Sequence, residues 1–309
     1  MPQRVWLRRW AKFQALGLSA AILAACGTST TEDRTLALAT VPPTATATTL
    51  PTDVPATATT APTATATSQP SVPPKTITSE PTASPTFTPE QAELERRFRA
   101  AVSDAEIAEA SEISDQLTII DANNRNLVRD EATGRVLVAT WTSWNGYDAL
   151  VGQETTTTRE TWVSVVPEMQ NFCKAYTATA DVPLTLRLEQ LLGLPANNGK
   201  NRIVHLWVPS EDLFRPSPDP EITDNIAQLE MPEASAFPSQ QDYEFSRDWF
   251  NLQRSLSYDA KNGYPWTRLG YTYDWGNPQS EVGLSEFVVW AKTTVKVESV
   301  TQNEVYCQP

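Results

Sequence analysis

Three carboxylate residues, Asp248, Asp274 and Glu286, lie in or beside aromatic-rich segments of the C-terminal half of the chain. Two carboxyl groups that flank a glycosidic bond can hydrolyse it without a histidine or a metal ion, provided that they lie ~5 to 9 Å apart. These three residues are therefore the candidates for a carboxylate-dependent hydrolase such as a glycosidase.

Residues 263–276 hold the densest group of aromatic side chains: Tyr264, Trp266, Tyr271, Tyr273 and Trp275. The last three alternate with polar residues, so on a strand their rings would share one face. Such a row forms either a wall of the core, which is the favoured interpretation, or an exposed platform on which a sugar ring or a peptide stacks.

A proline-rich loop at residues 210–224 carries Asp219, Glu221 and Asp224. Carboxylate oxygens on a stiff backbone suit calcium, which takes six to eight oxygen ligands. The spacing does not match an EF-hand, and a solvated loop in which Thr223 or Asp224 caps a following helix is favoured. We expect no metal ion, and these three acids are the calcium candidates if one binds.

The single histidine, His205, lies in an apolar stretch at residues 203–208. Alternation places it on the face of Ile203 and Trp207, which favours a structural histidine over a general base. The chain also lacks the signature motifs of serine hydrolases, nucleotide-binding proteins and zinc peptidases. No cofactor is indicated, and ligand binding is favoured over catalysis.

The elements that must position these residues form an irregular mixture of helices and strands. Apolar spacing and capping residues predict helices at residues 89–103, 183–192 and 242–258, and a short helix that starts at Pro167 and carries Cys173. Strands are expected at residues 117–121, 126–130, 134–141, 160–166, 202–208, 267–273 and 286–299. This order predicts a single α+β domain with a mainly antiparallel sheet and several helices.

The N-terminus carries four cationic residues, Arg4, Arg8, Arg9 and Lys12, before an uncharged apolar stretch at residues 13–25. A helix of that length spans only ~20 Å at ~1.5 Å per residue, less than the ~30 Å hydrocarbon core of a bilayer. This arrangement is typical of a signal peptide rather than of a retained membrane span.

The signal ends in Leu23-Ala24-Ala25-Cys26, which resembles the lipobox of bacterial lipoprotein precursors. The resemblance covers residues 1–27 and implies cleavage after residue 25 and lipidation of Cys26, whereas an ordinary secretory peptide with a chance cysteine is the alternative. It also implies an extracytoplasmic protein, anchored through lipid to the cell membrane or the outer membrane. Two acyl chains give a stable anchor where one gives only marginal binding.

Composition divides the rest of the chain in two. Residues 26–89 are dominated by threonine, proline and alanine, and such a segment cannot bury enough apolar surface to fold. We expect a disordered stalk there. Residues 90–309 contain eight of the ten tryptophans and are expected to form the globular α+β domain.

Lipidation of Cys26 would leave Cys173 and Cys307 as a pair in an oxidising compartment. We expect one disulfide between them, if the fold brings their Cα atoms within ~7 Å.

The globular part is strongly acidic, with a formal charge of −15 over residues 90–309. Binding to nucleic acid needs a basic surface, so that class of partner is not expected. The sequence predicts a membrane-anchored lipoprotein whose acidic head binds an envelope or extracellular ligand, a glycan or a peptide. Nothing in it indicates an oligomeric state.

Overall fold

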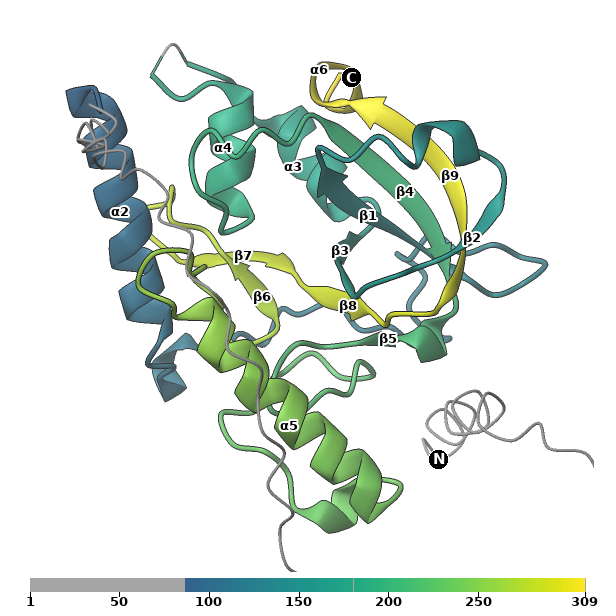
Figure 1. The fold of residues 1–309 in the computed structure, drawn as a ribbon. Helices are drawn as coiled ribbons and strands as arrows, with labels where there is room; N and C mark the ends of the chain where they lie inside the picture. The colour runs from purple at the N-terminus through teal and green to yellow at the C-terminus, as the bar shows by residue number, and fades with distance from the viewer. Residues whose placement is uncertain (1–86, 180, 309) are drawn as a thin grey trace, which may run out of the picture. The chain divides into compact units, whose positions relative to one another are not determined.

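The strands pair into a seven-stranded sheet in the computed structural model, which describes residues 87–179 and 181–308 (Figure 1). In sheet order they are β2 (Glu154–Thr156), β9 (Thr294–Gln302), β4 (Arg202–Val208), β1 (Val136–Thr142), β3 (Thr161–Val165), β8 (Phe287–Val289) and β5 (Leu213–Phe214). Each neighbouring pair is antiparallel. The expected α+β fold with a mainly antiparallel sheet is confirmed. The expected signal peptide, Cys26 and nearly all of the expected stalk lie outside the described residues.

A second, two-stranded sheet pairs β6 (Tyr271–Tyr273) with β7 (Val282–Ser285). The helices are α2 (Pro89–Ala105), α3 (Glu168–Ala175), α4 (Leu184–Leu191), α5 (Gln240–Ser257) and α6 (Asn303–Tyr306). Short 3₁₀ turns occur at Ala110–Glu112 (η1), Asp148–Leu150 (η2), Ser210–Asp212 (η3) and Ala234–Ala236 (η4). In the described part of the chain, no helix is both long and apolar enough to cross a bilayer.

One face of the large sheet carries a valine-rich cluster. Alternation along β1 and β4 directs Val136, Val138, Val204 and Leu206 to this face, where they meet Phe287. Loop residues, among them Ile120 and Leu127, belong to the same buried cluster. Hydrophobic residues therefore cover this face of the sheet, and the helices pack on the opposite face.

The opposite face of β1, with Leu137, Ala139 and Trp141, belongs to the buried cluster that includes residues of α3, α4 and α6. Here the expected disulfide is confirmed: Cys173 of α3 is bonded to Cys307, with 5.2 Å between their Cα atoms. The bond ties the end of the chain to the helical layer.

Four expected strands differ from the structure. Residues 126–130 form no strand, and only an isolated antiparallel bridge pairs Arg129 with Val136. Residues 117–121 are extended but join no ladder; the amides of Leu117 and Ile120 instead donate to carbonyls of the segment at residues 222–225. The expected strand at 267–273 shortens to β6 because Arg268 and Gly270 adopt positive φ angles of 61° and 77°. The expected strand at 286–299 divides into β8 and β9 at a turn in which Lys292 has a φ of 65°.

Candidate functional site

Two of the three candidate catalytic carboxylates are engaged elsewhere. Asp248 is exposed on α5 and forms an ion pair with Arg247 at 2.9 Å. Asp274 is 3 % exposed, and its two oxygens accept hydrogen bonds from the two terminal nitrogens of Arg187 at 2.8 and 2.6 Å. The prediction was therefore wrong for Asp248 and Asp274, because a long-range partner occupies Asp274 and solvent surrounds Asp248.

Glu286, the third candidate, lines a cavity of about 740 Å³. The cavity lies on the helix-bearing face of the large sheet and is lined by residues of β1, β3, α5 and the segment at residues 262–266. Trp162 pairs with Val288 and Val163 with Phe287, so continuing this register places Glu286 across from Ser164, which also lines the cavity. The sheet thus fixes the backbone position of Glu286 beside the cavity.

The Glu286 carboxyl group makes no hydrogen bond or ion pair with any of the residues that the structure describes. Burial without a partner favours the uncharged form of a carboxyl group. It raises the pKa of Glu286 to about 8. At neutral pH this side chain is mostly a neutral acid that can donate a hydrogen bond into the cavity.

Aromatic rings form much of the cavity wall. Trp162 and Trp266 meet edge to face with their ring centroids 6.3 Å apart. Trp144 is 57 % exposed, and its ring contacts Tyr147 edge to face at 4.8 Å. A side chain on Gly146 would overlap the Trp144 ring, so this glycine allows the ring to lie against the backbone of its own loop.

Charged and polar groups complete the lining. Glu160 accepts a hydrogen bond from the indole Nε1 of Trp249 at 2.8 Å, and Lys200 donates from Nζ to the carbonyl of Trp141 at 3.1 Å. Burial lowers the pKa of Lys200. The hydroxyl and amide side chains in the lining are Thr140, Thr142, Thr157, Thr158, Thr161, Ser164, Gln253, Ser257, Asn262 and Thr272.

The aromatic segment at residues 263–276 does not form an exposed platform. Tyr271 is 0 % exposed and its hydroxyl donates to the carbonyl of Glu112, while Trp275 packs edge to face on Phe98 at 6.0 Å. The favoured core interpretation therefore holds for these two rings, because helix α2 and the turn η1 cover them.

The other three aromatic residues of that segment, Tyr264, Trp266 and Tyr273, line the cavity. Trp266 is buried and its indole donates to the carbonyl of Pro216, whereas Tyr264 is exposed. Three of the five aromatic residues of this segment therefore line the cavity, and the other two lie in the core as the favoured interpretation expected.

His205 lies outside the cavity lining and packs edge to face on Tyr306, with 3.3 Å between its Nε2 and the tyrosine hydroxyl oxygen. Burial lowers its pKa, so the neutral ring is favoured. Its place in the fold is that of a packed structural histidine.

The calcium candidates Asp219, Glu221 and Asp224 do not come together as a three-carboxylate group. Their side chains accept hydrogen bonds from the backbone amides of Glu221, Thr223 and Ile226, respectively. No helix starts at Thr223 or Asp224, so the expected helix cap is also wrong.

The same loop surrounds Arg215, which is 1 % exposed and donates to the carbonyl of Asp224 at 2.7 Å. Burial lowers the pKa of Arg215, and the negative charges of Asp224, Glu221 and Asp219 oppose that shift. The loop is therefore largely buried rather than solvated, and its acids balance the charge of an arginine.

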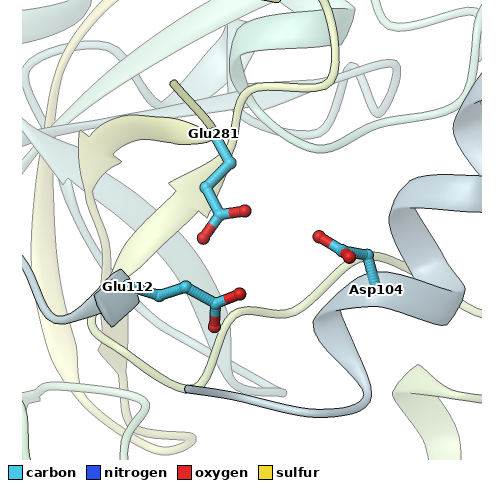
Figure 2. Close-up of side chains that lie close together, drawn as sticks. All are labelled: Asp104, Glu112 and Glu281. Carbon is cyan, nitrogen blue, oxygen red and sulfur yellow. The ribbon is translucent and has the colours of Figure 1, made fainter. Parts of the chain in front are cut away.

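Figure 2 shows a group of carboxylates that the sequence did not indicate, Asp104, Glu112 and Glu281, whose oxygens lie within 4.8 Å of one another. The hydroxyl oxygen of Tyr271 lies 3.0 Å from a carboxyl oxygen of Glu281 and shares its one hydrogen between this oxygen and the carbonyl of Glu112, while the hydroxyl of Tyr273 donates to Asp104 at 2.7 Å. Burial raises the pKa of Glu281, and the negative charges of Glu112 and Asp104 raise it further. Hydrogen bonds from the two tyrosine hydroxyls oppose this rise in pKa.

No family model, curated protein or solved structure matches this chain.

Proposed function

We propose that this chain is a membrane-anchored extracytoplasmic lipoprotein whose head domain binds a saccharide in the cavity at Glu286. The observation that carries the proposal is the composition of the cavity wall, which combines aromatic rings, hydroxyl and amide side chains and one carboxyl group that has no partner among residues 87–179 and 181–308. Concave sites of this volume, with apolar walls and a few polar groups, are typical of small-ligand sites.

A saccharide suits this wall because a sugar ring presents C–H groups on its faces and hydroxyl groups at its edge. The faces would pack on rings such as Trp144, Trp162 and Tyr264, while the hydroxyls would bond to the threonine and amide side chains of the lining. A largely neutral Glu286 can both donate and accept such a bond. The negative charge of the domain argues against a polyanionic ligand.

Titration of tryptophan fluorescence tests this proposal in the full-length protein in detergent. We expect neutral oligosaccharides to change the emission, because Trp144, Trp162 and Trp266 line the cavity. Trp144→Ala should weaken binding by about tenfold, or about 1.4 kcal/mol.

Trp207→Ala is the matched control, because Trp207 lies on the same sheet but outside the cavity lining. Its affinity should equal that of the wild type. Unchanged emission with every saccharide would contradict the proposal, and a response to short peptides alone would assign the cavity to another class of ligand.

The membrane anchor is a separate part of the proposal and rests on the lipobox resemblance around Cys26. Globomycin, an inhibitor of the lipoprotein signal peptidase, should cause the uncleaved precursor to accumulate. Cys26→Ser should abolish incorporation of labelled fatty acid, whereas Cys173→Ser should leave it unchanged. Normal processing under globomycin would contradict the anchor.

A further inference from the structure

We infer that the cavity hydrolyses the glycosidic bond of the saccharide that it binds, with Glu286 as the general acid and Glu160 as the base that activates water. This inference rests on the proposed saccharide binding. It goes beyond that proposal because it assigns a reaction and two catalytic residues to the cavity.

Glu286 has the position that a general acid needs. It reaches the cavity from the junction between β7 and β8, and no described side chain holds its carboxyl group. A raised pKa keeps the proton available at neutral pH, as it does for the acids of glycosidases.

Glu160 has a different environment in the same cavity. One of its oxygens accepts the indole hydrogen bond of Trp249, which holds the carboxyl group in place at the cavity wall. Trp249 is held in turn against Trp162 at 6.5 Å and Trp266 at 6.1 Å. Of the two carboxyl groups that line the cavity, we assign the one held by an indole as the base and the one without a partner among the described residues as the acid.

The register of the sheet constrains their separation. Thr161 pairs with Val289, so continuing the register places Glu160 opposite residue 290, four positions from Glu286 and on the same face. At ~3.3 Å per residue along a strand and ~4.8 Å between strands, the two Cα atoms are roughly 14 Å apart. The two glutamate side chains must lean toward each other across this span to act on one bond. The wider separation of an inverting pair, ~6.5 to 9.5 Å with a water molecule between the carboxyl groups, needs less of this approach than the ~5 Å of a covalent mechanism, so we expect inversion at the anomeric carbon.

In the reaction, the Glu286 proton passes to the oxygen of the leaving group as the bond from the anomeric carbon to that oxygen breaks. The oxygen of a water molecule bonds to the anomeric carbon from the opposite side, and Glu160 takes a proton from that water. The products are a sugar with a free anomeric hydroxyl and an alcohol. Exchange of one proton with solvent restores both carboxyl groups.

The experiment uses the full-length protein in detergent with the oligosaccharides that bind best in the fluorescence titration. Proton NMR follows the products and the configuration of the anomer formed first. We expect hydrolysis with inversion. Glu286→Gln should lower the rate at least 1000-fold while the affinity changes less than threefold, because glutamine keeps the shape of the side chain but cannot supply the proton.

Glu160→Gln should lower the rate of hydrolysis by a comparable factor. Added azide should restore turnover of this variant by forming the glycosyl azide of inverted configuration. Glu298→Gln is the matched control for Glu160, because Glu298 accepts an indole hydrogen bond from Trp207 outside the cavity. Glu168→Gln serves likewise for Glu286, because Glu168 is a half-buried carboxyl group of raised pKa that does not line the cavity. Both controls should retain wild-type rates.

Binding without hydrolysis would overturn this inference and leave the proposed function standing. A wild-type rate in Glu286→Gln, or products of retained configuration, would also overturn it. Absence of binding would instead contradict the proposed function itself.

Discussion

Replacing Cys173 and Cys307 together by serine is expected to lower the free energy of unfolding by about 4 kcal/mol. The bond closes a loop with a sequence separation of 134 residues, so it removes much conformational entropy from the unfolded chain. It also joins α3 to the end of the chain, where Tyr306 belongs to the same buried cluster. Guanidinium denaturation followed by circular dichroism measures the loss.

The wild type under a reducing agent is the control for this variant. Reduction should lower its unfolding midpoint to that of the double serine variant, whereas the same agent should leave the variant unchanged. A double variant that unfolds at the wild-type midpoint would show that the bond contributes nothing to stability.

Glu286→Gln is expected to raise the free energy of unfolding by about 3 kcal/mol at pH 9 and to leave it nearly unchanged at pH 5. The pKa of Glu286 is about 8 in the folded protein, above the ordinary value of 4.5. The stabilising effect of the bound proton is therefore complete below pH 4.5 and is lost as the pH rises through 8. One pKa unit corresponds to about 1.4 kcal/mol of unfolding free energy. Water that enters the cavity solvates the carboxylate, so we expect a total below the product of this value and the full pKa shift.

Thermal unfolding of the two proteins between pH 4 and pH 10 measures this difference. Other titrating groups contribute equally to both, so the difference between the curves isolates Glu286. We expect the curves to separate between pH 5 and 8 and to run parallel above that range. Curves that stay parallel throughout would show that Glu286 titrates as an ordinary carboxyl group.

Helices α2, α4 and α5 could be predicted from the sequence because their signals are local. α2 begins at Pro89 behind a capping box of Thr88 and Gln91, and α4 is followed by Gly193 with a φ of 62°. Ser239 caps α5 with its side chain. Such signals act within a few residues and do not depend on the rest of the fold.

The strands near the C-terminus were harder to predict because their ends depend on turns. Thr267 accepts the amide of Leu269 and donates to the carbonyl of Tyr271, which closes a turn where a continuous strand was expected. Gly270 permits this turn because a side chain there would meet Arg215. The composition of the segment resembles that of a strand, and only the tertiary contact reveals the turn.

The site itself could be predicted only in part. Glu286 was among the three candidates, but the sequence could not separate it from Asp274, whose partner Arg187 lies 87 positions away. Trp144 was missed, although the dipeptide Asn145-Gly146 after it is a turn signal that can present an aromatic ring to solvent. Glu160, Trp162 and Lys200 reach the cavity through sheet pairing and loop packing, which local spacing does not encode.

The most direct test of the cavity as the functional site is a co-crystal structure of the protein with the oligosaccharide that binds best. We predict electron density for a sugar within hydrogen-bonding distance of Glu286 and in stacking contact with at least one of Trp144, Trp162 and Tyr264. Density for the sugar on another surface, with this cavity free of it, would contradict the account.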